Sequence, residues 1–240
     1  MRAVRQFGLL PIVLVLRLLQ DPIAHAQTAG LPLLPEKDYA DWAAIGRLNI
    51  AGFRIRRACT GTLIAPRWVL TAAHCVVESD GVQEQPGNVH FVAGWLRGDF
   101  VWHGRAKSVH VHPDSARGPA ADLALIELQG PAPTEIIEPI PIAMHAPHLD
   151  EASAIIGYQS TRAAMLSAAF ECPLTQVLGA VRILNCPVIP GLSGSPVLSQ
   201  TAQGWQVQAV VSARVERDGR AQALVVAPGV WASETINPSP

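Results

Sequence analysis

The sequence predicts an all-β protein built from two small lobes, and three observations support this prediction. Short apolar and β-branched runs recur along the chain, separated by Gly, Pro, Asp and Asn. No long segment with a 3.6-residue apolar period competes with them, and the helices that a parallel α/β fold needs between its strands are missing. Hydrophobic residues make up 49% of the chain, which is enough for a sizeable core in one compact unit.

The first 26 residues predict a cleavable secretory signal rather than part of the fold. Arg2 and Arg5 form a basic start, residues 8–16 an apolar stretch, and a small-residue cleavage site ends at Ala26. Arg17 interrupts the apolar run well short of the roughly 20 residues that a membrane span needs. We therefore expect a secreted or periplasmic protein, cleaved after Ala26, with no membrane span in its mature chain.

Charge gives no indication of a polyanionic partner. The formal net charge is −1. The signal segment holds three arginines and one aspartate, so the rest of the chain carries about −3. Because no run of basic residues is present, we expect no nucleic-acid partner, and no motif indicates a cofactor.

The first lobe is predicted over residues 42–130, after an extended arm at 27–41 that is rich in proline and small residues. Each expected strand is a short apolar run that ends at a turn-forming residue. The runs that meet this description are 42–49, 59–64, 68–71, 89–94, 106–112 and 123–128.

The second lobe is predicted over residues 131–240, after a link marked by Gly130, Pro131 and Pro133. A short helix is expected at 231–236. The strands expected before it are 140–143, 154–158, 168–172, 180–184, 196–198, 206–212 and 223–227.

A possible nucleophile lies between Gly191 and Pro196, in the run Gly-Leu-Ser-Gly-Ser-Pro. A serine hydroxyl is a poor nucleophile at neutral pH, so Ser193 needs a base and an orienting acid. His74, in the run Leu-Thr-Ala-Ala-His-Cys, offers the base. Asp122, which heads the apolar run Leu-Ala-Leu-Ile, offers the acid.

These three motifs, in the order His, Asp, Ser, resemble the chymotrypsin-like (trypsin-like) serine proteases over roughly residues 42–231. The form of the serine motif is most similar to the bacterial glutamyl endopeptidase group. The resemblance implies two antiparallel β-barrels packed face to face, with the site between them. It also implies a monomeric serine endopeptidase that acts on protein or peptide substrates.

The resemblance assigns a role to each residue. His74 takes the proton of the serine hydroxyl and returns it to the departing amine, while buried Asp122 holds the imidazole in the correct tautomer. Ser193, not Ser195, aligns with the reactive position, and the amides of Gly191 and Ser193 form the oxyanion hole. Each residue also has a non-catalytic alternative. His74 would be a core histidine, Asp122 a solvated acid at a strand entry, and Ser193 part of a plain surface turn. Asp99 and Asp114 are rival acids.

Leu192 departs from the family pattern. Trypsins usually have an aspartate there, which pairs with a new amino terminus after zymogen cleavage. This chain lacks that aspartate and an Arg-Ile-Val-Gly-Gly-type activation site near the start of the first lobe. We therefore predict that local packing orders the oxyanion loop, stiffened by Cys186, Pro187 and Pro190.

Substrate preference depends on the residues around the specificity pocket. By resemblance, Ser212 and Arg214 lie on the strand that pairs with substrate, and Pro187 and Val188 lie at the wall or base of the specificity pocket. No acidic residue stands at the wall, and Val211 replaces the histidine of the glutamyl endopeptidases. An apolar or small residue before the cleaved bond is expected, while Arg214 either crowds the pocket or binds an acidic group.

Four cysteines in an exported chain predict two disulfides, and sequence alone leaves three pairings open. Nearest neighbours would pair Cys59 with Cys75 and Cys172 with Cys186, and the resemblance implies the same first bridge. Each would contribute about 3 kcal/mol in the chain-entropy model. Zinc is the rival use, but close Cys-Xaa-Xaa-Cys pairs are absent, so no metal site is expected.

Two other functions are alternatives to a serine endopeptidase. A non-catalytic binding protein on the same fold is the main one, because Leu192 stands where trypsins have the aspartate that orders the loop. An α/β-hydrolase esterase needs a Gly-Xaa-Ser-Xaa-Gly elbow and the order Ser, Asp, His, and both are absent. Of the remaining histidines, His110 and His112 are expected to be structural, and His145 and His148 lie in a proline-rich loop without a ligand set.

Overall fold

A computed structural model describes residues 30–51, 55–143, 153–217 and 219–237 of the chain. The predicted signal segment and its cleavage site lie outside the described residues, as do His145 and His148. Within the described residues, no helix is long and apolar enough to cross a membrane.

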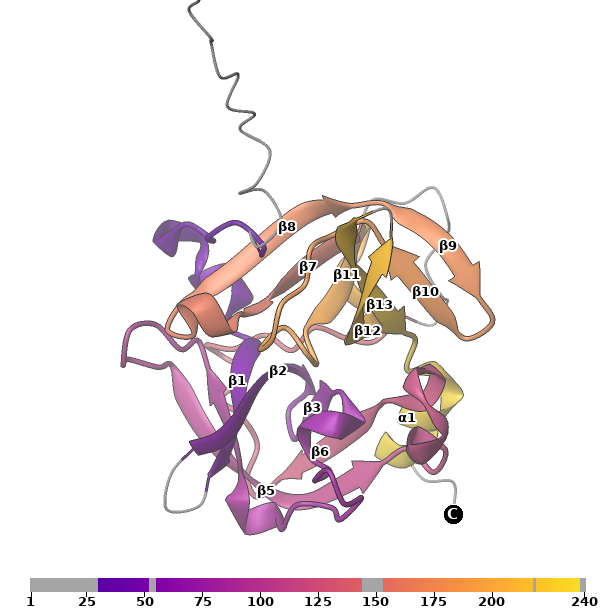
Figure 1. The fold of residues 1–240 in the computed structure, drawn as a ribbon. Helices are drawn as coiled ribbons and strands as arrows, with labels where there is room; N and C mark the ends of the chain where they lie inside the picture. The colour runs from indigo at the N-terminus through magenta and orange to yellow at the C-terminus, as the bar shows by residue number, and fades with distance from the viewer. Residues whose placement is uncertain (1–29, 52–54, 144–152, 218, 238–240) are drawn as a thin grey trace, which may run out of the picture.

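The first lobe is a closed antiparallel barrel with the strand order β1-β2-β3-β6-β5-β4 (Figure 1). Strand β4 pairs with β1 and so closes the ring. The strands are β1 (Ile45–Ala51), β2 (Ile55–Ala65), β3 (Trp68–Thr71), β4 (Val89–Ala93), β5 (Trp102–Val111) and β6 (Ala124–Leu128).

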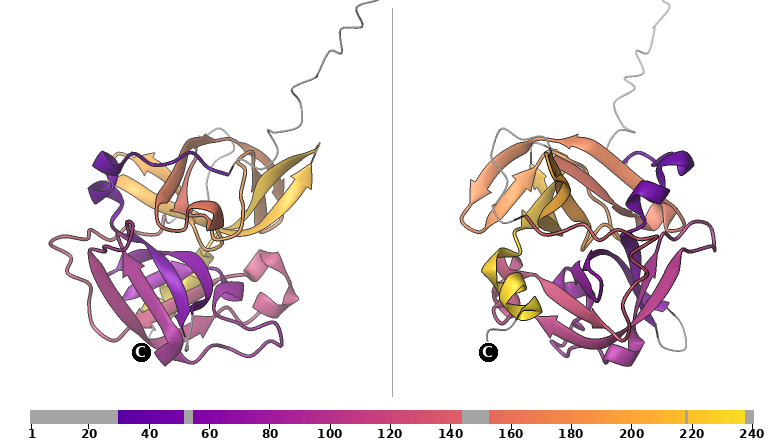
Figure 2. Two further views of the ribbon diagram at one scale, coloured as in Figure 1. Left: turned by 60° about the vertical axis from the view of Figure 1, so that its left-hand side comes forward. Right: turned by 180° about the vertical axis from the view of Figure 1, so that it is seen from behind.

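The second lobe is a seven-stranded antiparallel sheet with the order β8-β7-β11-β12-β13-β10-β9, which lies over the barrel in each view (Figures 1 and 2). Its strands are β7 (Ser153–Tyr158), β8 (Leu166–Cys172), β9 (Leu174–Leu178), β10 (Val181–Leu184), β11 (Pro196–Thr201), β12 (Gly204–Arg217) and β13 (Arg220–Val226). The predicted all-β, two-lobed fold class is confirmed, although this sheet is open in its hydrogen-bond ladder where the barrel is closed.

Short helical segments lie before, between and after the strands. The α-helix α1 (Gly229–Ile236) confirms the predicted terminal helix and returns to the first lobe, where Trp231 packs on His112 with ring centroids 5.0 Å apart. The 3₁₀ turns are η1 (Glu36–Asp38), η2 (Ala40–Trp42), η3 (Ala73–Cys75), η4 (Pro86–Asn88), η5 (Ser115–Arg117), η6 (Pro119–Ala121) and η7 (Ser160–Arg162).

Two strand predictions were wrong. Residues 140–143 form no strand, only an isolated bridge between Ile142 and Val207, because Pro139 and Pro141 lack the N–H groups that a ladder needs. Strand β9 was missed, because it is a largely exposed edge strand whose apolar signal is weak.

One hydrophobic core runs through both lobes. It joins barrel residues such as Leu70 and Leu125 to second-lobe residues such as Ile156 and Leu198, all at most 1% exposed. A smaller cluster, defined here as the loop cluster, lies inside the second lobe. Its buried members are Leu31, Ile155, Cys172, Leu184, Cys186, Val188, Leu192, Val197, Ala209, Val211, Ala223 and Val225. The predicted lobe boundary near residue 130 is not tested by this packing and stays a prediction.

Candidate active site

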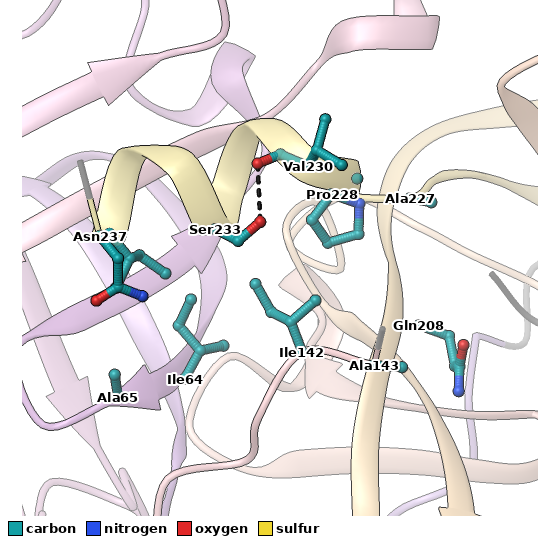
Figure 3. A pocket seen from close by; sticks show the side chains of 12 residues that line it. Ile64, Ala65, Ile142, Ala143, Gln208, Ala227, Pro228, Val230, Ser233 and Asn237 are labelled. Atoms are coloured by element: carbon teal, nitrogen blue, oxygen red, sulfur yellow. Dashed lines mark hydrogen bonds between the residues drawn. The ribbon is translucent and has the colours of Figure 1, made fainter. Parts of the chain in front are cut away.

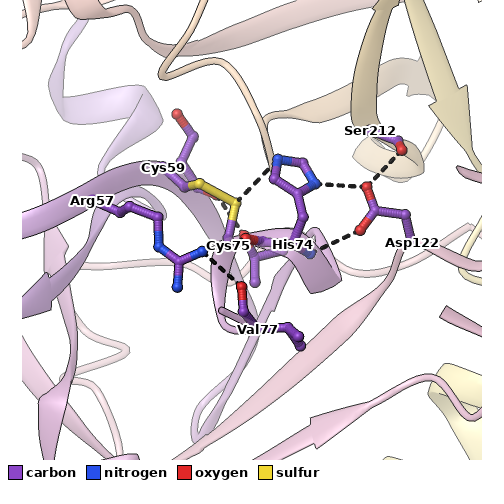
Figure 4. Close-up of polar contacts among 9 residues, drawn as sticks. Arg57, Cys59, His74, Cys75, Val77, Asp122 and Ser212 are labelled. Carbon is purple, nitrogen blue, oxygen red and sulfur yellow. Dashed lines mark hydrogen bonds and ion pairs between the residues drawn. A yellow bond between two sulfur atoms is a disulfide. The ribbon is translucent and has the colours of Figure 1, made fainter. Parts of the chain in front are cut away.

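His74 is held at the end of a barrel strand. It lies in η3, directly after β3, and the neighbouring Cys75 is joined to Cys59 by a disulfide. The guanidinium of Arg57 donates to the His74 carbonyl oxygen at 3.1 Å and to the Val77 carbonyl oxygen at 2.6 Å. Figure 4 shows the imidazole between the disulfide and Asp122. The backbone of His74 is therefore fixed, while its side chain is 46% exposed.

Asp122 lies against this imidazole. Its Oδ2 is 2.7 Å from His74 Nδ1, and its Oδ1 accepts the backbone N–H of His74 at 2.9 Å. The Ser212 hydroxyl donates to Asp122 Oδ2 at 2.6 Å (Figure 4). With a hydrogen bond to Asp122, Nδ1 carries the proton, which leaves Nε2 as the basic nitrogen.

The charge of Asp122 is stabilised despite burial. The residue is 8% exposed. Burial opposes ionisation and would raise its pKa, but the hydrogen bonds and positive charge of His74, together with the Ser212 hydroxyl, outweigh it and lower the pKa. Asp122 is therefore a carboxylate at neutral pH, as an acid that stabilises an imidazolium must be.

Ser193 lies in a turn that precedes β11, and the first lobe holds that turn. The backbone N–H of Thr60, in β2, donates to the Ser193 carbonyl at 2.9 Å, and the Thr60 hydroxyl donates to the Gly191 carbonyl at 3.0 Å. The same hydroxyl accepts the N–H of Tyr158 at 3.0 Å. A single buried threonine thus joins the two lobes at the serine turn.

The turn is closely packed at Gly191, and two of its amides have no acceptor among the described residues. Gly191 has φ of +96°, and a Cβ there would lie 2.7 Å from the Tyr158 carbonyl and 2.9 Å from Ser160 N. The N–H of Ser160 donates to the Pro190 carbonyl at 2.7 Å. Among the described residues, the amides of Gly191 and Ser193 have no hydrogen-bond acceptor. Two free N–H groups in one tight turn can bind a developing oxyanion.

A pocket of about 340 Å³ opens beside Ser193. Residues of β12 and of the loop before the serine form its walls. They are Val188, Ile189, Pro190, Ser193, Val211, Ser212, Ala213 and Arg214. Three of the four residues predicted to bind substrate therefore line it, and Pro187 does not. Arg214 is paired with Glu216 at 2.5 Å.

The structure brings the predicted residues together in two groups. His74, Asp122 and Ser212 form one hydrogen-bonded chain, and Ser212 also lines the pocket with Ser193. Within the described part of the chain, no hydrogen bond joins the Ser193 hydroxyl to His74, whose Nε2 lies 3.9 Å from Cys75 Sγ. Catalytic hydrogen bonds are often long without substrate, so this contact stays a prediction.

The rival residues have other partners. Asp114 pairs with Arg117 at 2.8 Å, whereas Asp122 is the carboxylate that bonds His74. Ser195 is fully buried, which makes it inaccessible to a substrate. His110 accepts or donates a hydrogen bond at 2.8 Å with Ser108, and His112 packs on Trp231, so both have structural contacts.

Both predicted disulfides, Cys59–Cys75 and Cys172–Cys186, are present, which resolves the open pairing. Cys59, Cys75 and His74 lie close enough to suggest a metal site, but disulfide sulfurs offer no thiolate ligand. A different cavity, of about 550 Å³, lies between α1 and the side chains of Ile64 and Ile142 (Figure 3). None of the predicted site residues lines it.

Sequence reasoning missed Arg57 and Thr60, and gave Ser212 only a substrate role. No local motif marks the first two, because their contacts depend on the pairing of β1, β2 and β3 and on lobe docking. Their partners lie 17 to 131 residues away in sequence.

A two-lobed β-fold with a His–Asp pair beside a serine turn defines the class of chymotrypsin-like serine proteases. The Trypsin family model matches residues 37–178, more than half of the chain, so the chain belongs to the Trypsin family. This match includes His74 and Asp122 and ends before Ser193. The assignment to the glutamyl endopeptidase group stays a prediction.

Individual relatives agree with the family. A "Trypsin" from Saccharopolyspora erythraea is 35% identical over 111 residues, which is 43% of this chain and 44% of the relative. The chain thus spans under half the length of this curated relative.

Two solved structures share the fold. The thermostable serine protease AL20 from an extremophilic microorganism aligns with a TM-score of 0.70 at 17% identity, over 82% of this chain and 97% of its own. Protease Anisep from Arthrobacter nicotinovorans aligns with a TM-score of 0.68 at 18% identity, over 81% and 94%.

Proposed function

We propose that this protein is a serine endopeptidase whose catalytic residues are His74, Asp122 and Ser193. The observation that carries the proposal is the hydrogen-bonded chain from His74 through Asp122 to Ser212, which ends at the wall of the pocket that Ser193 also lines. Membership of the Trypsin family supports the same conclusion.

In the proposed reaction each of these residues has one role. Neutral His74 removes the proton of Ser193 Oγ through Nε2 while the oxygen attacks the peptide carbonyl carbon. The amides of Gly191 and Ser193 stabilise the oxyanion, and Asp122 stabilises the imidazolium without taking its proton. Collapse of the intermediate breaks the C–N bond, and His74 protonates the leaving amine. Water then attacks the acyl-enzyme with His74 as base and restores Ser193.

The pocket favours an apolar residue before the cleaved bond. Val188 and Val211 are at most 3% exposed, and no acidic side chain lines the pocket. Arg214 pairs with Glu216 at 2.5 Å, so an acidic substrate group would compete with Glu216 for its guanidinium. A peptide library should therefore show apolar or small residues at the cleaved position. A preference for Glu or for Arg would contradict this.

Export is part of the proposal. The apolar segment before Arg17 and the two disulfides both fit an oxidising compartment, reached through a signal that is removed after Ala26. Sequencing the amino terminus of the exported protein tests this, and retention of residues 1–26 would contradict it.

The activity is tested by labelling with a fluorophosphonate probe and by hydrolysis of a peptide library. Wild type should be labelled at Ser193, Ser193→Ala should lose labelling and hydrolysis, and the matched control Ser195→Ala should keep both. A folded wild type without a Ser193 adduct would instead support the non-catalytic binding protein. Equal hydrolysis by wild type and Ser193→Ala would show that the nucleophile is wrong.

A further inference from the structure

The arm before the first lobe has a defined place beside the serine turn. Leu31 is fully buried and belongs to the loop cluster, together with Leu192 and Cys186. Leu34, three residues on, is 1% exposed but packs in the core that the two lobes share. Pro32 and Leu34 attach the arm to β8 through backbone hydrogen bonds of 2.8 and 3.0 Å. The arm, which the sequence predicted to have little structure, thus places Leu31 in the same apolar cluster as Leu192.

A polar path leads from Leu31 to the oxyanion loop. The Leu31 carbonyl accepts hydrogen bonds from Gln159 Nε2 at 3.1 Å and from Arg162. Gln159 is 1% exposed, and the residue after it, Ser160, donates its N–H to the Pro190 carbonyl at 2.7 Å.

That last hydrogen bond sets the direction of an oxyanion-hole donor. The Pro190 carbonyl and the Gly191 N–H belong to one planar trans peptide, so they point in opposite directions. With the carbonyl held toward Ser160, the N–H of Gly191 is directed away from the turn that binds Leu31. A shift of Gln159 and Ser160 would release this peptide plane.

The fit of the arm is close. A Cβ at Gly30 would lie 2.1 Å from Gln159 Oε1 and 3.0 Å from Ile189 Cδ1. Ile189 lines the substrate pocket. The backbone of Gly30 is therefore packed against both the Gln159 turn and the pocket wall.

We infer that Gly30 and Leu31 are positioning residues that keep the oxyanion loop in its active arrangement, by apolar packing beside Leu192 and by the hydrogen bonds of Gln159. This inference rests on the proposed peptidase function and adds the means by which its anion site is ordered. Leu31 contributes an apolar side chain and a backbone carbonyl to these contacts.

Leu31→Ala and Leu34→Ala are the matched variants, because each removes the same side-chain atoms from a buried position of one arm. We expect similar losses of thermal stability. Only Leu31→Ala should lower kcat for a peptide amide, by at least about tenfold, with KM nearly unchanged, because the anion site acts mainly in the transition state. Affinity for a peptide aldehyde, whose adduct places an oxyanion in the hole, should fall with kcat. Leu31→Met should restore both.

The outcomes separate the two proposals. If the wild type hydrolyses peptides and the two variants Leu31→Ala and Leu34→Ala have the same kcat, the inference is wrong and the peptidase assignment still holds. A folded wild type that neither hydrolyses peptides nor labels at Ser193 would overturn the peptidase assignment and the inference with it. If Leu31→Ala does not fold, Gly30→Ala gives the same test, since its methyl group displaces Gln159 while Leu31 stays intact.

Discussion

The two halves of the candidate site differ in what must be held in place. On the closed barrel (the polar half), hydrogen bonds and a disulfide fix His74 and Asp122, whose side chains must keep the direction of a proton transfer. On the open sheet (the packed half), the turn that contains Ser193 must keep the path of its backbone. Hydrogen bonds with Thr60 and Ser160 hold this turn, and the packing of buried Leu192 in the loop cluster adds to them. Substitutions should therefore affect the two halves differently.

The largest effect is expected where the polar half is broken. Asp122→Asn should lower kcat by about 10⁴, as is typical of this family, because an amide in place of the carboxylate favours the wrong imidazole tautomer. Asp114→Asn, a control at an exposed acid that pairs with Arg117, should leave kcat unchanged. Steady-state hydrolysis of a peptide substrate measures both. Comparable activity of Asp122→Asn and wild type would remove Asp122 from the mechanism.

The next effect is expected in the packed half. Gly191→Ala should lower kcat by about 10² to 10³, because the new methyl group collides with the Tyr158 and Ser160 backbone and displaces an oxyanion donor. Gly204→Ala is the control. Its φ of +102° is similar to the +96° of Gly191, but a Cβ there meets open space. Equal losses of activity in the two variants would mean that backbone strain alone is responsible.

The two disulfides, one in each half of the site, should contribute about equally to stability. Replacing both cysteines of either bridge by alanine should cost about 3 kcal/mol of unfolding free energy, because the bridges join residues 16 and 14 apart in sequence. Denaturant unfolding measures this cost. The activity that remains distinguishes the two bridges. Loss of Cys59–Cys75 loosens His74, whereas loss of Cys172–Cys186 loosens the loop cluster. Full activity without Cys59–Cys75 would show that hydrogen bonds alone position His74.

Ser212 is the contact between the two halves, and its removal should have a moderate effect. Ser212→Ala takes one hydrogen bond from the Asp122 carboxylate, which keeps its two bonds to His74, so we expect about a tenfold loss of kcat. Ser167→Ala is the control, because the buried Ser167 hydroxyl has no hydrogen-bond partner among the residues that the structure describes. An unchanged kcat in Ser212→Ala would show that the hydroxyl does not support the acid.

The smallest expected effect is a dependence of stability on acid pH. The pKa of Asp122 is lower in the folded than in the unfolded chain, so its ionisation stabilises the fold above the unfolded value of about 4. This contribution is lost as pH falls through the folded pKa. Without the Ser212 hydroxyl the pKa is lowered less, so the difference in unfolding free energy between wild type and Ser212→Ala should shrink in acid. A constant difference in denaturant unfolding at neutral and acid pH would contradict this.

Much of the candidate site could be predicted from the sequence because its motifs are local. The run from Leu70 to Cys75, the aspartate at the head of an apolar strand and the glycines around Ser193 each need particular residues within a few positions. The β class was visible for the same reason, since alternation and turn residues are properties of short segments. The error at residues 140–143 also has a local cause, because Pro139 and Pro141 interrupt the hydrogen bonding of an otherwise apolar run.

Local patterns in the sequence predict the fold class, the place of the terminal helix and the candidate catalytic residues. The disulfide pairing, the partners of Asp122 and His74, the role of Thr60 between the lobes and the burial of Leu31 in the same cluster as Leu192 depend on the tertiary structure. The physical reason is distance along the chain. Contacts between residues 14 or more positions apart arise only when the strands pair and the lobes dock, and no pattern within a short segment encodes them.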